Sequence, residues 1–108
     1  MASLVCAAVQ LDAGSDRGAN FARAEELVRA AAGRGARLVV LPEVFAWRGP
    51  PAGEVAIAEP IPGPSSERCS ALARELGIWL VAGSLHERRD ADTVFNTSLL
   101  LSPAGELV

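Results

Sequence analysis

The fold is decided by one stretch of the chain, Ala36-Arg37-Leu38-Val39-Val40-Leu41-Pro42-Glu43-Val44-Phe45. Its apolar run is typical of a strand buried on both faces of a sheet. Pro42 ends the strand, because proline donates no backbone hydrogen bond and restricts the residue before it. In an open α/β sheet, the carboxyl ends of the strands face the ligand crevice. The stretch therefore predicts an α/β fold that carries Glu43 at this edge.

Glu43 is the candidate catalytic residue. At the rim of the core we expect its carboxylate to be partly removed from water. Desolvation disfavours the charged form, so such a carboxylate accepts a proton more readily than an exposed one. The alternative is a structural glutamate that caps a helix or pairs with an arginine. When Glu43 is considered without the rest of the sequence, this structural alternative is favoured.

The segments before this stretch predict a strand-helix-strand unit. Leu4 to Leu11 is apolar and is expected to form a buried first strand. A helix follows, with Gly33 and Gly35 at its end and with apolar residues at helical spacing, namely Phe21, Ala24, Leu27, Val28 and Ala31. The second strand, Arg37 to Leu41, is thus reached by a crossover, which favours parallel pairing.

The segments after it complete a layered sheet. Residues 48–64 are rich in Gly and Pro and are expected to be irregular. Ser65 or Ser66 is expected to cap a second helix, whose apolar stripe is Cys69, Leu72, Ala73 and Leu76. A third strand, Ile78 to Ser84, and a fourth, Val94 to Leu101, are joined by a short charged loop and are expected to pair antiparallel. The order predicts an α/β layered sheet.

The composition of the chain disfavours several classes of function. The 108 residues form one domain or a piece of one, and the formal charge of −3 disfavours nucleic acid as a partner. No apolar run is long enough to span a bilayer and no basic signal region opens the chain, so a cytoplasmic location is expected. Two cysteines and one histidine predict no metal site. Half of the residues are hydrophobic, which suggests that some apolar surface is covered from elsewhere.

The thiols and the histidine are weak catalytic candidates. Cys6 lies within a predicted strand and Cys69 on a buried helical stripe, so both are expected to be inert core residues. His86 falls in the charged loop, where a solvated side chain is expected. A thiol hydrolase built from Cys69, His86 and Glu43 requires three distant elements to converge, and we disfavour it.

Two further features of the sequence are its glycines after the first strand and its two tryptophans. The glycines after the first strand lack the spacing of a dinucleotide-binding loop. Trp79 is expected in the core, whereas Trp47, in the long loop after Glu43, is a candidate wall of a pocket.

The segments taken together resemble the nitrilase superfamily of carbon-nitrogen hydrolases over nearly the whole chain. The segments that carry the resemblance, in order, are Ala7–Leu11, Arg37–Glu43, Ile61–Pro64, Leu72-Ala73, Ile78–Ser84, Phe95–Thr97 and Ser102–Glu106. The segment Gly83 to Arg88 is most similar to the branch of small amidases acting on ω-amides of dicarboxylic acids.

The resemblance implies an α-β-β-α sandwich of which residues 1–108 form the N-terminal portion, so the fold here is incomplete. It implies hydrolysis of a small amide or nitrile, or acyl transfer, by a Glu-Lys-Cys triad without cofactor, in a homo-oligomer when complete. Glu43 matches the triad glutamate, which takes the proton of the cysteine and later activates water, while lysine stabilises the developing charge. Asn96 matches a supporting position.

This sequence departs from the pattern in two respects. It contains no lysine, and neither Cys6 nor Cys69 matches the position of the nucleophile. We therefore expect the isolated chain to be inactive, and substrate-binding residues stay unknown. Two other classes remain open: a degenerate, non-catalytic interaction domain, and an unrelated small α/β binding module in which Glu43 is structural.

Overall fold

The computed structural model describes residues 2–108 as a mixed α/β fold. Its elements, in chain order, are β1 (Cys6–Ala8), α1 (Arg17–Gly33), β2 (Leu38–Val40), the 3₁₀ turn η1 (Pro51–Gly53), α2 (Glu54–Ile57), α3 (Pro64–Leu76), β3 (Trp79–Arg88) and β4 (Val94–Leu101). None of the helices within these residues combines the length and the apolar character that a membrane span requires.

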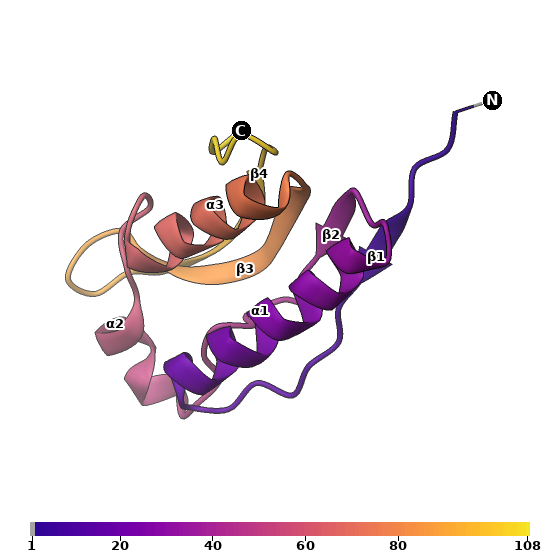
Figure 1. The fold of residues 1–108 in the computed structure, drawn as a ribbon. Helices are drawn as coiled ribbons and strands as arrows, with labels where there is room; N and C mark the ends of the chain where they lie inside the picture. Colours follow the sequence, from indigo (N-terminus) through magenta and orange to yellow (C-terminus); the bar gives the residue numbers. More distant parts are fainter. Residues whose placement is uncertain (1) are drawn as a thin grey trace.

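The strands form one four-stranded sheet in the order β1-β2-β3-β4. β1, β2 and β3 are parallel, and β4 pairs antiparallel with β3. The predicted crossover and the predicted antiparallel pair are both confirmed. Both α1 and α3 lie against the same face of the sheet (Figure 1).

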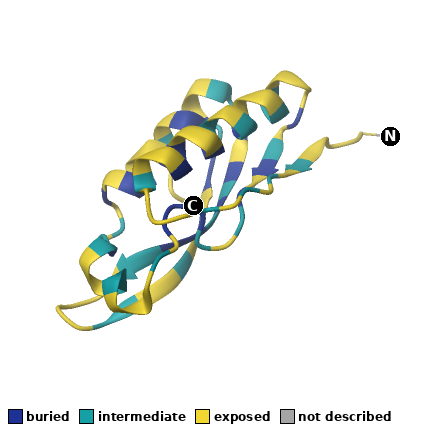
Figure 2. Cartoon of the chain, turned by 90° about the horizontal axis from the view of Figure 1, so that it is seen from below, coloured by how far each residue is buried: buried dark blue, intermediate teal, exposed yellow. Residues whose placement is uncertain are grey.

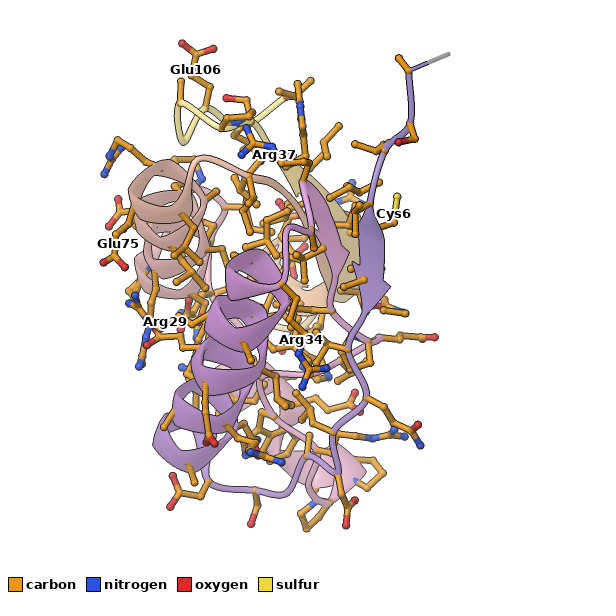
Figure 3. All side chains as sticks on the ribbon, turned by 45° about the vertical axis from the view of Figure 1, so that its right-hand side comes forward. Cys6, Arg29, Arg34, Arg37, Glu75 and Glu106 are labelled. Carbon is orange, nitrogen blue, oxygen red and sulfur yellow. The ribbon has the colours of Figure 1, made fainter. Side chains whose placement is uncertain are left out.

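The core lies between the helices and the sheet, where Figure 2 shows the buried positions gathered. α1 begins after Asp16, whose carboxylate accepts a hydrogen bond from the backbone N–H of Ala19. Its predicted apolar face is buried at Phe21, Ala24 and Val28. Across the outer surface, Arg29 of α1 pairs with Glu75 of α3 (Figure 3). The Arg29 guanidinium holds the pKa of the Glu75 carboxyl below its ordinary value.

The first strand is shorter and more exposed than predicted. Within residues 2–108, β1 pairs only with β2, which spans Leu38–Val40 and is too short to extend the ladder over the predicted Leu4 to Leu11. The register places Cys6, Leu38 and Trp79 side by side on the face opposite the helices. Cys6 is exposed and Trp79 is 40% exposed, so their expected core positions are wrong. Figure 3 shows the Cys6 side chain pointing away from α1.

The segment between β2 and α3 is more regular than predicted. It contains η1 and α2, although Pro and Gly interrupt it. α3 begins at Pro64, a favoured first helical residue, so neither Ser65 nor Ser66 is the N-cap. The Ser66 hydroxyl instead accepts a hydrogen bond from the Gly63 N–H and donates one to the Gly63 carbonyl. Gly77 ends the helix with a positive φ of 63°.

In the part of the chain that the structure describes, one face of the sheet is covered by no helix and is apolar. We call it the open face; its residues are Cys6, Ala8, Leu38, Val40, Trp79, Val81 and Leu100. Val40 and Leu100 are 36% and 37% exposed, respectively. Contiguous apolar surface of this kind favours association.

We therefore expect isolated residues 1–108 to self-associate and to bind a hydrophobic dye. Each Å² of apolar surface left bare forfeits about 25 cal/mol of burial, so an uncovered patch of a few hundred Å² offsets much of a small domain's net stability. Size-exclusion chromatography and dye fluorescence measure both effects. The matched variant Trp79→Thr, which makes the open face more polar, should reduce association. A monodisperse, dye-negative monomer that unfolds cooperatively would contradict this expectation.

Candidate active site

Glu43 lies in a turn directly after β2, where the sequence predicts it. The turn is locally strained, because Val44 adopts a φ of 52°, a region that β-branched residues rarely occupy. The buried Ser84 hydroxyl accepts a 2.9 Å hydrogen bond from the Val44 backbone N–H and holds the turn to β3. This hydrogen bond is a tertiary contact, and it stabilises a backbone conformation at Val44 that is locally unfavourable.

Gly83 lets β3 approach the same turn. A Cβ atom at Gly83 would lie 1.8 Å from the Pro42 carbonyl oxygen and 2.2 Å from that of Leu41. The register of the β3–β4 ladder shifts between Ala82 and Leu85, a range that includes Gly83 and Ser84. Gly83 and Ser84 therefore lie at an irregularity of β3, and Gly83 allows the backbone of β3 to pack closely against the turn that carries Glu43.

Asn96 of β4 contacts Glu43. Its Nδ2 donates a 2.9 Å hydrogen bond to Oε1 of the carboxylate, joining positions that are 53 residues apart. Both residues are exposed, so the expected desolvation of Glu43 is not found within residues 2–108. The turn buries Phe45 at 1% exposure and leaves Glu43 exposed.

Two adjoining hollows lie beside the turn, and together we call them the His86 groove. One is lined by Val44, Glu54, His86, Val94, Phe95 and Asn96. The other is lined by Val44, Trp47, Arg48, Gly49, Pro51, Glu54 and His86. The two hollows share Val44, Glu54 and His86, and Glu43 lines neither of them. Trp47 lines the groove, as predicted.

His86 lies on a strand, not in the predicted solvated loop. β3 continues to Arg88, because its pairing with β4 extends through His86 and Asn96, which are directly opposite each other. The His86 side chain is 13% exposed, and its Nε2 lies 3.9 Å from Oε1 of Glu54. Its ring meets Trp47 edge to face. Sequence spacing gave no sign of this arrangement, since Glu54 is 32 positions away in the chain.

The two thiols stay outside this groove. Cys69 is buried on α3, and burial raises the pKa of its thiol to about 12, as expected for an inert core residue. Cys6 is on β1. Neither lines the groove, so the disfavoured cluster of Cys69, His86 and Glu43 finds no support. Among residues 2–108, no three His, Cys, Asp or Glu side chains converge as a metal site would require.

We expect Ser84→Ala to loosen the Glu43 turn. The partly buried Val44 N–H would lose its partner, and a buried donor left unsatisfied costs about 1–3 kcal/mol, so a loss toward the lower end of that range is expected. Urea unfolding of the protein should show that loss of stability. Ser66→Ala, which removes another buried hydroxyl away from the turn, is the control for general destabilisation. If only Ser84→Ala perturbs the Glu43 and Asn96 signals in NMR spectra, the tether is confirmed; unchanged signals would contradict it.

Known proteins share both the sequence and the fold. The family model described as carbon-nitrogen hydrolase matches residues 6–108. The chain is 40% identical over 111 aligned positions to the ω-amidase NIT2 of Danio rerio, an alignment that covers 100% of this chain and 39% of the relative. It is 37% identical over 107 positions to human deaminated glutathione amidase, with 94% of this chain and 33% of the relative covered.

Solved structures of similar proteins have the same fold as this chain. The structure of Saccharomyces cerevisiae Nit3, a member of the nitrilase superfamily, superimposes with a TM-score of 0.81 at 30% identity, over 92% of this chain and 40% of Nit3. An amidase from Nesterenkonia sp. gives a TM-score of 0.83 at 25% identity, over 97% of this chain and 40% of the amidase. The chain therefore spans between a third and two fifths of the length of these relatives. On the match to residues 6–108, the chain belongs to the carbon-nitrogen hydrolase family and has the nitrilase fold.

Proposed function

We propose that Glu43 is the general base of an amide-hydrolysing active site. The observation that carries the proposal is the hydrogen bond from Asn96 Nδ2 to Oε1 of Glu43, in a turn held by Ser84. This bond fixes one carboxylate oxygen and orients the other to accept a proton. A purely structural glutamate would be expected to pair with arginine, yet within residues 2–108 Glu43 has no ion-pair partner.

The proposed chemistry follows the Glu-Lys-Cys scheme. Glu43 takes the proton of a cysteine thiol as its sulfur attacks the amide carbon; that proton leaves with the amine, and Glu43 then activates water against the thioester. The ammonium group of a lysine stabilises the oxyanion. The sequence contains no lysine, and neither of its thiols lines the groove. We therefore propose that other residues of a complete protein supply both groups.

The proposed substrate is a small amide. Relatives bear the names ω-amidase and deaminated glutathione amidase, which supports amide hydrolysis over nitrile hydrolysis as the reaction. A cytoplasmic homo-oligomer stays our expectation for the complete protein. A non-catalytic interaction domain is the competing reading.

The test is ammonia release by the complete protein, compared with residues 1–108 alone. We expect turnover of butyramide and of monoamides of dicarboxylic acids by the former only. The isolated chain should be inactive, since loss of triad members typically costs several orders of magnitude in rate. Equal turnover by the isolated chain, abolished by Glu43→Gln, would overturn the proposed division of the site. No turnover by either protein would favour the interaction domain.

A further inference from the structure

We propose that Asn20 is a positioning residue for the active site: from α1, its side-chain amide clamps the turn that places Glu43. The inference rests on the proposed function of Glu43 as the general base, and it adds a residue that holds the backbone of that base in place. Asn20 does not touch the substrate in this proposal. It acts through Ala46, which follows Glu43 three positions later in the chain.

The Asn20 side chain has no role within its own helix. Asn20 lies in the first turn of α1, but the N-cap of that helix is Asp16, so the amide is not needed as a cap. Asparagine is also a weak helix former, because its side chain competes with the backbone for hydrogen bonds. Asn20 is nevertheless buried, at 6% exposure. A polar side chain this deeply buried requires hydrogen-bond partners, and tertiary contacts supply them.

The Asn20 amide joins two separate loops. Its Oδ1 accepts a 3.0 Å hydrogen bond from the Gly14 N–H, and its Nδ2 donates to the Gly14 carbonyl at 2.8 Å and to the Ala46 carbonyl at 2.9 Å. The Gly14 carbonyl also accepts a 2.8 Å hydrogen bond from the Arg48 N–H. The amide therefore ties the loop before α1 to the segment after Glu43, directly at Ala46 and through Gly14 at Arg48.

This second anchor adds to the one from β3. The Ser84 hydroxyl holds the Val44 N–H, and the Asn20 amide holds the Ala46 carbonyl two residues later. A non-glycine residue with a positive φ, such as Val44, persists where the surrounding structure over-determines it. Because Glu43 directly precedes Val44, the two anchors together set the position of its backbone.

The position of this backbone decides where the Glu43 carboxylate lies. Glu43 is exposed, and within residues 2–108 its carboxylate accepts one hydrogen bond, from Asn96. Few contacts of its own therefore hold the carboxylate, and a misplacement of about 1 Å costs about 100-fold in rate. Asn20 lines neither hollow of the His86 groove. Loss of the clamp should thus slow the chemical step and leave substrate affinity nearly unchanged.

The test is the kinetics of Asn20→Ala in the complete protein, with butyramide as the amide. We expect kcat to fall about 10- to 100-fold while KM stays within about threefold of the parental value. The matched control is Val28→Ala, which removes fully buried volume about two turns further along the same helix and destabilises the fold. Its kcat per folded molecule should be parental. Equal losses of kcat in the two variants would make Asn20 a structural residue and overturn the proposal.

A double variant separates positioning from a general loss of stability. If Asn20 acts through Glu43, adding Asn20→Ala to Glu43→Gln should lower kcat no further, because residues that act as a unit are not additive. A further loss of the same 10- to 100-fold, found on top of Glu43→Gln, would contradict action through Glu43.

Phe21→Leu is a milder second variant, which keeps the α1 face apolar if Asn20→Ala does not fold. The Phe21 ring packs edge to face against Phe45, between Val44 and Ala46, with 5.3 Å between the ring centroids. Its replacement should loosen the same side of the turn and lower kcat by a smaller factor, again with KM nearly unchanged. Parental kcat in a folded Phe21→Leu protein would contradict a clamp from α1.

An NMR measurement separates this inference from the proposed function. In Asn20→Ala, the signals of Glu43 and of the Asn96 side-chain amide should shift, whatever the activity. Shifted signals together with full turnover in Glu43→Gln would refute the role of Glu43 as the base and leave the clamp standing. Unshifted signals and parental kcat in Asn20→Ala, beside an inactive Glu43→Gln protein, would overturn the clamp and leave Glu43 as the base.

Discussion

Glu43→Gln in the complete protein is expected to lower kcat by about 10²- to 10⁴-fold, the usual contribution of a positioned general base. Glutamine keeps the shape of the side chain, and its carbonyl oxygen still accepts the Asn96 hydrogen bond. It cannot accept the proton of the thiol, so acylation should collapse while KM changes little. Single-turnover kinetics with a chromogenic amide measure the acylation step directly.

The matched control is Glu26→Gln, which removes an exposed carboxylate from the outer side of α1. It should leave kcat unchanged. Thermal unfolding of both variants should match that of the parent protein, because Glu43 is exposed and its loss removes no buried contact. Full activity in Glu43→Gln with unchanged stability would return Glu43 to a structural role.

Gly83→Ala is expected to be the most destabilising single change near the site. Its Cβ would meet backbone oxygens of Pro42 and Leu41, and backbone cannot swing aside as a flexible side chain does. Overpacking of this kind costs about 3 kcal/mol or displaces the backbone. Displacement would move Glu43 away from Asn96, so activity should fall together with the urea midpoint.

Gly33→Ala is the control for glycine replacement. No atom lies within 4 Å of a Cβ built there, and its φ is not positive, so the change should be neutral or slightly stabilising. Parental stability in Gly83→Ala would show that β3 and the Pro42 turn do not pack as closely as the structure has them.

The sequence predicted those helices and strands whose apolar residues recur at a regular spacing, because these residues contact the core directly. Three elements carry a local pattern and form as predicted: the strand before Pro42, the helix with Phe21, Ala24 and Val28 at helical spacing, and β4. The strand before Pro42 is nevertheless buried on one face only, and its predicted burial on both faces is wrong, because Val40 on the open face is 36% exposed. Apolar runs also led to the wrong prediction that β1 and Trp79 are buried. The sequence does not distinguish an apolar residue that a helix covers from one that lies exposed on the open face. Glu43 as the catalytic residue stays a prediction.

By itself, the sequence determined the α/β order and the position of Glu43 at the end of a strand, since both depend on short-range patterns and on proline's missing donor. The tertiary structure alone decided what surrounds that carboxylate. The Ser84 tether, the Gly83 approach, the Asn96 hydrogen bond and the pairing of His86 with Glu54 join residues at least 32 positions apart in the chain. Such contacts depend on strand register and on a strained turn at Val44, and neither leaves a periodic signal in the chain.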